Sequence, residues 1–240
     1  MTTLLLKERL KKIFVGGPAA PERPAASPRG PIVSSRSVRA TESGTSYSRH
    51  SHGLEQFFSH IQSDQNLWIL DLAGASQANV GFITSLGHRL YSVDFLRTLD
   101  TTFDATGDDP LAGQFDARRI GRFLDENLDF EDRFFDGAMV WDCLEFLAPP
   151  LLKETIDRLH RITKPGANLL AFFHAEEKAV SIPSYNYRIG DAGTLLLTPR
   201  GPRRAAQHFN NRAIEKMFHQ FRSVKFFLAR DHLREVIITR

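Results

Sequence analysis

The chain has 240 residues, of which 42% are apolar and 25% are charged, a composition typical of a folded globular protein. It contains no run of about 18 apolar residues, so the sequence predicts no membrane-spanning helix. The single cysteine, Cys143, excludes an internal disulfide framework and a cysteine-based zinc site, and it favours a reducing, cytoplasmic location.

The formal net charge of +3 is unevenly distributed along the chain. Residues 1–50 contain nine Lys and Arg but only three Asp and Glu, so the remaining residues are net acidic. Because the basic residues lie outside the expected folded part, the high isoelectric point does not indicate that the domain binds nucleic acid.

Residues 1–50 are predicted to be an N-terminal tail that precedes a folded domain over residues 51–240. Residues 15–50 are rich in proline and then in serine and arginine, and they bury too little apolar surface to fold, so we expect a disordered linker. In residues 3–14, apolar side chains recur near helical spacing with Lys and Arg between them. This segment could contact a membrane or partner as a basic amphipathic helix, dock on the domain, or fray.

The later segments alternate between helical and strand patterns in chain order. Helices are predicted at residues 52–62, 77–86, 116–126, 149–163 and 211–221. Strands are predicted at residues 67–72, 88–95, 128–130, 134–141 and 167–174, followed by an antiparallel hairpin over 223–240. This alternation indicates an α/β fold with a mostly parallel sheet, in which ligands bind beyond the carboxyl ends of the strands.

Four stretches in this order carry a family resemblance: ILDLAGAS, YSVDF, FFDGAMVWDCLEFL and LHRITKPGANLLAFFH. Together with the final hairpin, they resemble the class I S-adenosylmethionine-dependent methyltransferase family over residues 52–240. The resemblance implies a three-layer Rossmann-like sandwich whose seven-stranded, mostly parallel sheet has an antiparallel last strand. It also implies S-adenosylmethionine as the cofactor, with a small molecule as the expected methyl acceptor.

The resemblance assigns a cofactor site to the turn after the first strand and to the ends of the neighbouring strands. The turn at residues 73–77 would run under the methionine part, and Asp71 would fix that turn or the cofactor amino group. Asp94 would bind the ribose hydroxyls, because one carboxylate can accept both. The candidates for cofactor binding are Asp71, Ala73, Gly74, Ala75, Ser76, Asp94, Phe95, Trp141 and Asp142.

Each of these residues also has a structural interpretation. Asp71 and Asp142 could cap the helical turns that follow them, and Asp94 could be an ordinary surface turn residue. Trp141 could belong to the hydrophobic core. An adenine-binding acid could be Asp125, Glu126 or Asp129, and the sequence does not choose between them.

The turn departs from the family pattern Asp-x-Gly-x-Gly-x-Gly. Ala73, Ala75 and Gln77 replace the three glycines, and Gly74 lies one residue out of register. The Gln77 side chain could enter the pocket or point along the helix. The turn therefore either still admits the cofactor or belongs to a non-catalytic binding or regulatory protein.

Outside the cofactor turn, His174 at the end of a predicted strand could be a general base or a structural histidine. Tyr185 and Tyr187, in the insert at 178–208, could contact the substrate or could simply pack in a loop. The histidines are scattered, so the sequence predicts no metal site, and Cys143 is expected to be buried packing. The sequence does not indicate the oligomeric state.

Overall fold

The computed structural model describes residues 45–103, 109, 111–176, 179–227 and 233–240. All of them belong to one compact unit, Thr41–Arg240. The predicted segment at 3–14 and most of the predicted linker lie outside the described residues. The predicted end of the linker at residue 50 was wrong, however, because Tyr47–His50 form strand β1, which pairs antiparallel with a later strand.

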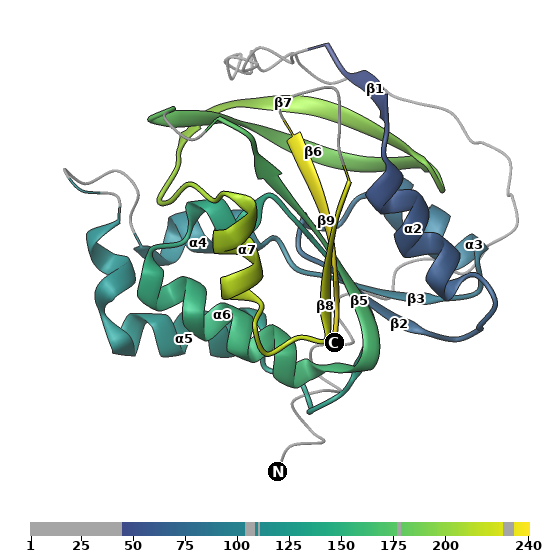
Figure 1. The fold of residues 1–240 in the computed structure, drawn as a ribbon, viewed down its shortest axis with the longest axis horizontal. Helices are drawn as coiled ribbons and strands as arrows, with labels where there is room; N and C mark the ends of the chain where they lie inside the picture. Colours follow the sequence, from purple (N-terminus) through teal and green to yellow (C-terminus); the bar gives the residue numbers. More distant parts are fainter. Residues whose placement is uncertain (1–44, 104–108, 110, 177–178, 228–232) are drawn as a thin grey trace, which may run out of the picture. The chain divides into compact units, whose positions relative to one another are not determined.

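The central sheet has six strands in the order β3-β2-β4-β5-β9-β8 (Figure 1). Neighbouring strands are parallel from β3 to β5, while β9 runs antiparallel to both β5 and β8. The predicted α/β class, with a mostly parallel sheet and an antiparallel strand, is therefore confirmed. The strands are β2 (Trp68–Asp71), β3 (Arg89–Ser92), β4 (Phe135–Trp141), β5 (Thr163–His174), β8 (Ser223–Phe227) and β9 (Leu233–Thr239).

The prediction of seven strands was wrong for the described part of the chain, because no strand forms at residues 128–130. Leu128 instead caps the preceding helix, and its N–H donates to the Leu124 carbonyl at 2.7 Å. Leu128 and Phe130 are apolar because they are buried in the core from a connecting loop. Periodicity alone cannot separate such a loop from a short buried strand.

Helices cover both faces of the sheet and make the predicted three layers (Figure 1). Apolar side chains of the first two helices pack on one face, and those of the remaining four pack on the other. Side chains successive along β4 point to opposite faces, as the pleat requires. The helices are α2 (His52–Ile61), α3 (Gln77–Ser85), α4 (Phe95–Phe103), α5 (Ala117–Asn127), α6 (Pro149–Ile162) and α7 (Asn211–Met217).

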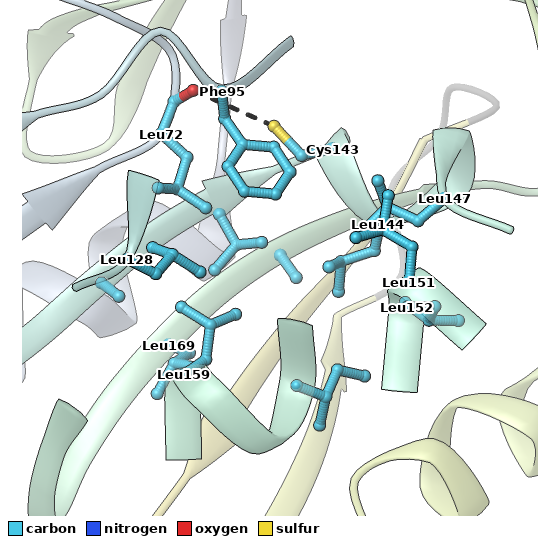
Figure 2. Close-up of a cluster of buried hydrophobic side chains, with 14 of the residues drawn as sticks. Leu72, Phe95, Leu128, Cys143, Leu144, Leu147, Leu151, Leu152, Leu159 and Leu169 are labelled. Carbon is cyan, nitrogen blue, oxygen red and sulfur yellow. Dashed lines mark hydrogen bonds between the residues drawn. The ribbon is translucent and has the colours of Figure 1, made fainter. Parts of the chain in front are cut away.

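The larger hydrophobic core lies between the sheet and the second group of helices (Figure 2). Leu72 and Phe95 approach Cys143 there, next to the leucines of α6 and β5. Cys143 is 1% exposed, and its burial raises the pKa of the thiol well above the usual range. Cys143 is thus a packing residue, as predicted.

A second, three-stranded antiparallel sheet was not predicted. The insert after β5 folds into the hairpin β6 (Ser181–Asp191) and β7 (Thr194–Arg204), and β1 pairs with the outer side of β7. Ile182 and Ser184 are buried in β6, and after a register shift between Ser184 and Tyr185 the buried positions are Tyr187 and Ile189, so one face of the strand packs inward on each side of the shift. The hairpin packs on the same face of the central sheet as α2 and α3.

No helix within the described residues is both long enough and apolar enough to cross a membrane.

Candidate functional site

Asp71 organises the turn at the carboxyl end of β2. Its carboxylate is fully buried and accepts hydrogen bonds from the Ala73 N–H at 2.9 Å, Asn79 Nδ2 at 2.9 Å and Trp141 Nε1 at 2.7 Å. Burial raises the pKa of this carboxyl, and the three hydrogen bonds lower it. Asp71 therefore holds together the turn, the start of α3 and the end of β4.

Gly74 supplies the conformation that this turn needs. Its φ is +87°, a left-handed value that favours glycine, and a Cβ placed there would lie 3.2 Å from Asp94 Cβ. The Gly74 N–H donates to the Val93 carbonyl at 3.0 Å, and Ala73 forms a bridge to Asp94. Only one glycine is required because the described backbone at 73 and 75 has no positive φ.

Asn79 is a site residue that the sequence analysis missed. It is fully buried in α3, where Nδ2 donates to Asp71 and to the Tyr187 carbonyl, and Oδ1 accepts from the Ile189 N–H at 2.9 Å. It thus joins the turn to β6. The only sequence signal is a polar residue on the inner side of a helix that follows an acidic strand end.

A polar cavity of about 570 Å³ lies between the turn and β6. Its walls are the residues Ala73–Ala78 on one side and Asn186–Arg188 on the other. Gln77 is among the lining residues and is exposed, so its side chain borders the cavity. Ser76 makes no side-chain capping bond to α3, so backbone N–H groups of the first helical turn stay available there.

Asp94 and Phe95 differ in their placement. Asp94 is partly exposed at the end of β3, and its Oδ1 accepts from the Arg97 N–H at 3.3 Å, so it also caps α4. Phe95 is fully buried, and its ring packs edge-on against Phe123 with ring centres 4.9 Å apart. Phe95 therefore belongs to the core (Figure 2), away from the surface of the turn.

Trp141 and Tyr187 fill the space beside the turn. The Trp141 side chain is fully buried, and its ring stacks on that of Tyr187 at 4.9 Å with an interplanar angle of 10°. The Trp141 φ is +56°, an uncommon value for a tryptophan that holds the indole over Asp71. The cavity bounded by Asp94, Trp141, Asp142 and the hairpin residues Tyr185, Tyr187 and Arg200 has a volume of only about 10 Å³.

Asp142 is a buried acid facing the hairpin. It is 1% exposed, and its Oδ2 has no hydrogen-bond partner among the described residues. Burial raises the pKa of this carboxyl to about 7; nearby His174 lowers the pKa, Glu145 raises it and the Tyr187 hydroxyl lowers it. The side chain is thus poised between its neutral and charged forms near neutral pH.

His174 and Glu145 form a buried pair next to Asp142. The His174 Nδ1 lies 2.7 Å from Glu145 Oε2, and the His174 N–H also donates to this carboxylate at 2.9 Å. Burial lowers the pKa of His174, but the hydrogen bond and charge of Glu145, together with the charges of Asp142 and Glu176, raise it, so the net shift is upward; burial raises the pKa of Glu145. The His174 Nε2 is buried and has no hydrogen-bond partner within the described chain.

The sequence analysis missed Glu145, although it follows Asp142 by three residues. Glu145 lies in a short 3₁₀ turn, Cys143–Phe146, directly after β4, and it is fully buried. Its position brings a carboxylate under the end of β5, where His174 lies. An acid inside an otherwise apolar stretch is the signal that could have identified it, since buried acids are rare unless paired.

A largely apolar cavity of about 250 Å³ adjoins His174. It is lined by Tyr47, His174, Glu176, Ile182, Pro183, Tyr185, Leu197 and Leu233. Tyr185 also borders the closed space beside Trp141, so the two cavities are neighbours. Of the two predicted substrate residues, Tyr185 lines this apolar cavity, while Tyr187 is 2% exposed and stacks on Trp141.

Searches against known proteins gave matches only among solved structures, since no family model and no curated protein matches the chain. A 1,6-didemethyltoxoflavin-N1-methyltransferase from Burkholderia thailandensis, solved with its substrate and S-adenosylhomocysteine, is 15% identical, with 78% of this chain and 75% of that one covered and a TM-score of 0.43. An S-adenosylmethionine-dependent methyltransferase from Archaeoglobus fulgidus is 13% identical, with coverages of 78% and 91% and a TM-score of 0.46. A methyltransferase of the same kind from Methanosarcina mazei is 15% identical, with coverages of 75% and 95% and a TM-score of 0.44.

These structures are of the family that the sequence motifs resemble. Their identities with this chain are 13 to 15% and their TM-scores lie below 0.5.

Proposed function

We propose that this chain is an S-adenosylmethionine-dependent methyltransferase that acts on a small-molecule acceptor. The observation that carries the proposal is the turn after β2, at the carboxyl edge of the sheet, which contacts both Asp71 and Asp94. In this turn, Gly74 has a left-handed conformation and lies against Asp94. Asp71 holds the turn in place by accepting a hydrogen bond from the Ala73 N–H. This is where open α/β sheets bind their ligands.

The residues present fit the chemistry of the cofactor. The absence of a side chain at Gly74 lets the turn pack directly against Asp94, whose carboxylate could accept both ribose hydroxyls. The polar cavity over residues 73–78 suits the amino-acid end, with backbone N–H groups at the start of α3 for its carboxylate. When bound, S-adenosylmethionine supplies an activated methyl group on a positively charged sulfur.

Three buried side chains would serve the acceptor. Asp142 offers a carboxylate oxygen without a protein partner, so it can stabilise positive charge beside the turn. His174 borders the apolar cavity, and its free Nε2 could take a proton from an acceptor held there. Glu145 would orient the ring and stabilise the protonated imidazole.

The hairpin β6–β7 must move before the whole cofactor can enter. Tyr185, Tyr187 and Arg200 leave only about 10 Å³ beside Asp94 and Asp142. Asn79 ties β6 to α3 through the Tyr187 carbonyl and the Ile189 N–H. We therefore expect binding to be coupled to a shift of this hairpin, which would then close the site from water.

Calorimetric titration of the full chain with S-adenosylmethionine and S-adenosylhomocysteine tests the proposal. We expect saturable binding of both, and weaker binding after Asp94→Ala, because the ribose would lose its carboxylate partner. A matched control is Asp64→Ala, which alters an exposed aspartate in the turn after α2. Absence of binding of either ligand at millimolar concentration would reject the proposal.

A second candidate function is a non-catalytic binding or regulatory protein with the same fold. The closed space beside Asp94 favours it, together with Ala73, Ala75 and Gln77 in the turn. If the double substitution Ala73→Gly and Gln77→Gly creates cofactor binding that the native chain lacks, the result supports this second function over the first. Equal, tight binding by both proteins would exclude it.

A further inference from the structure

Three metal-ligating side chains meet on the surface where β1 joins α2. His50 is the last residue of β1, while His52 and Glu55 lie in the first turn of α2. All three are exposed, and their candidate ligand atoms lie within 4.8 Å of one another. The sequence analysis found the histidines scattered, but this group follows the short pattern His-x-His-x-x-Glu.

The distances within the group match those around a tetrahedral ion. His50 Nε2 lies 3.1 Å from His52 Nδ1 and 3.7 Å from Glu55 Oε2, and His52 Nδ1 lies 3.5 Å from the same oxygen. Ligand atoms about 2.0 to 2.1 Å from a tetrahedral zinc ion lie roughly 3.3 to 3.4 Å apart. Small side-chain rotations would bring all three atoms to this spacing.

The backbone that carries these ligands is held from inside the domain. Ser51 and Gly53, which alternate with the two histidines, both donate to Glu235 Oε2, at 3.0 and 2.6 Å. A Cβ at Gly53 would lie 2.9 Å from Leu170 Cδ1, so the start of α2 sits directly on the sheet. Ser51 is fully buried, and its N–H donates to the Gly193 carbonyl at 2.8 Å. The ligands therefore project from a fixed scaffold, which reduces the entropy lost on binding.

The surrounding charge also favours a cation. Asp191, the last residue of β6, places a carboxylate near His50: a Cβ at Gly193 would lie 3.2 Å from His50 Cε1 and 3.9 Å from Asp191 Oδ1. Carboxylates near metal-bound histidines commonly orient the ring and raise its basicity. Two imidazoles and one carboxylate suit Zn²⁺, Co²⁺ or Ni²⁺ rather than Mg²⁺ or Ca²⁺, which prefer oxygen ligands.

We propose that His50, His52 and Glu55 form a surface binding site for a divalent transition-metal ion of the Zn²⁺ type. Water completes the coordination, because the three side chains lie at the surface. The ion joins the end of β1 to the start of α2. It thereby fixes β1, whose Tyr47 lines the apolar cavity next to His174. The proposal of this site does not rest on the proposed methyl transfer.

Titration of the tag-free full chain with Zn²⁺, and with Co²⁺ as a visible-light probe, tests the proposal at pH 7.5. We expect one equivalent to bind and Co²⁺ to give absorption bands of a low-coordinate site. His52→Asn and Glu55→Gln should each weaken Zn²⁺ binding roughly tenfold or more. In other metal sites, the loss of a residue that only hydrogen-bonds to a ligand already weakens metal binding by about this factor. Both substituted side chains are exposed, so the fold should persist, which circular dichroism checks.

His60→Asn is the matched control. His60 is an exposed histidine in the last turn of the same helix, outside the group. Its substitution should leave the Zn²⁺ affinity unchanged. The proposal is overturned if the native chain binds no Zn²⁺, or if a double variant lacking His50 and His52 binds it as tightly as the native chain.

Discussion

The imidazole Nδ1 of His174 lies 2.7 Å from Glu145 Oε2, and both side chains are buried at the carboxyl edge of the sheet. Nε2 of His174 is buried without a hydrogen-bond partner in the described chain, and His174 is among the residues that line an apolar cavity. A carboxylate that holds a histidine in this way both sets the tautomer and stabilises the charged ring. Under the proposed function, this pairing would suit His174 to act as a base.

Replacing Glu145 by Gln should lower the pKa of His174. Burial alone lowers this pKa, and Glu145 is the main group that raises it, so its neutralisation leaves the effect of burial dominant. Titration of the His174 ring by NMR measures the shift. Glu154→Gln, at an exposed position of α6, is the control and should leave the pKa unchanged. An unchanged or higher pKa in Glu145→Gln would show that the pair does not form.

Between pH 4 and 7, the free energy of unfolding should fall less in Asp142→Asn than in the native chain. In the unfolded chain the carboxyl deprotonates near its usual pKa of 3.8, whereas burial raises the pKa in the folded chain to about 7. The folded state thus binds more protons between these values, and its stability decreases as pH rises from 4 to 7. The contribution is on the order of 4 kcal/mol.

Urea unfolding at several pH values compares the native chain with this variant. The free energy of unfolding of Asp142→Asn should fall less between pH 4 and 7 than that of the native chain. Asp64→Asn, an exposed residue, should follow the native curve. Parallel curves for the native chain and Asp142→Asn would contradict the buried, proton-binding carboxyl.

Most of the central layer could be predicted because its signals are local. Apolar runs mark β2, β4 and β5, and caps such as Asp116, which accepts from the Arg118 N–H at 2.8 Å, mark helix starts. The hairpin β6–β7 was missed because its alternation is broken by a register shift between Ser184 and Tyr185. Helix α4 was missed because its polar residues obscure the apolar stripe.

Of the candidate site, only the residues at the ends of the strands could be predicted from the sequence. Because parallel strands end at one edge, Asp71, Asp94 and Asp142 could be expected to lie near one another. Asn79 and Glu145 stand out in the sequence only as polar residues on apolar faces, and their partners could not be predicted, since each contact is tertiary, with β6 or with β5. Phe95 was predicted as a site residue because it follows Asp94, but it begins α4 and lies on the buried face of that helix, so its ring packs in the core.

Gly74→Ala should destabilise the chain by about 1 to 2 kcal/mol, because alanine disfavours the left-handed conformation and its Cβ would crowd Asp94. Gly121→Ala is the matched control. Gly121 lies inside α5 with open space around it, so alanine there should stabilise by about 0.5 to 1 kcal/mol. Thermal unfolding of both variants measures the difference. Equal effects of the two substitutions would exclude the strained turn.

Addition of S-adenosylmethionine should shift the fluorescence of Trp141 to longer wavelength. Trp141 is stacked on Tyr187, and entry of the cofactor requires the hairpin to move off it. The chain has two tryptophans, so Trp68→Phe isolates the signal. An unchanged spectrum, under conditions where calorimetry detects binding, would show that the hairpin stays closed over Trp141.

The most direct measurement is a crystal structure of the chain with S-adenosylhomocysteine. We predict electron density for the amino-acid end over residues 73–77, a ribose within hydrogen-bond distance of Asp94, and Tyr185, Tyr187 and Arg200 displaced from their positions beside Asp142. Ligand density away from this turn, or a hairpin that remains closed with no ligand at saturating concentration, would contradict the assignment of the turn as a cofactor site.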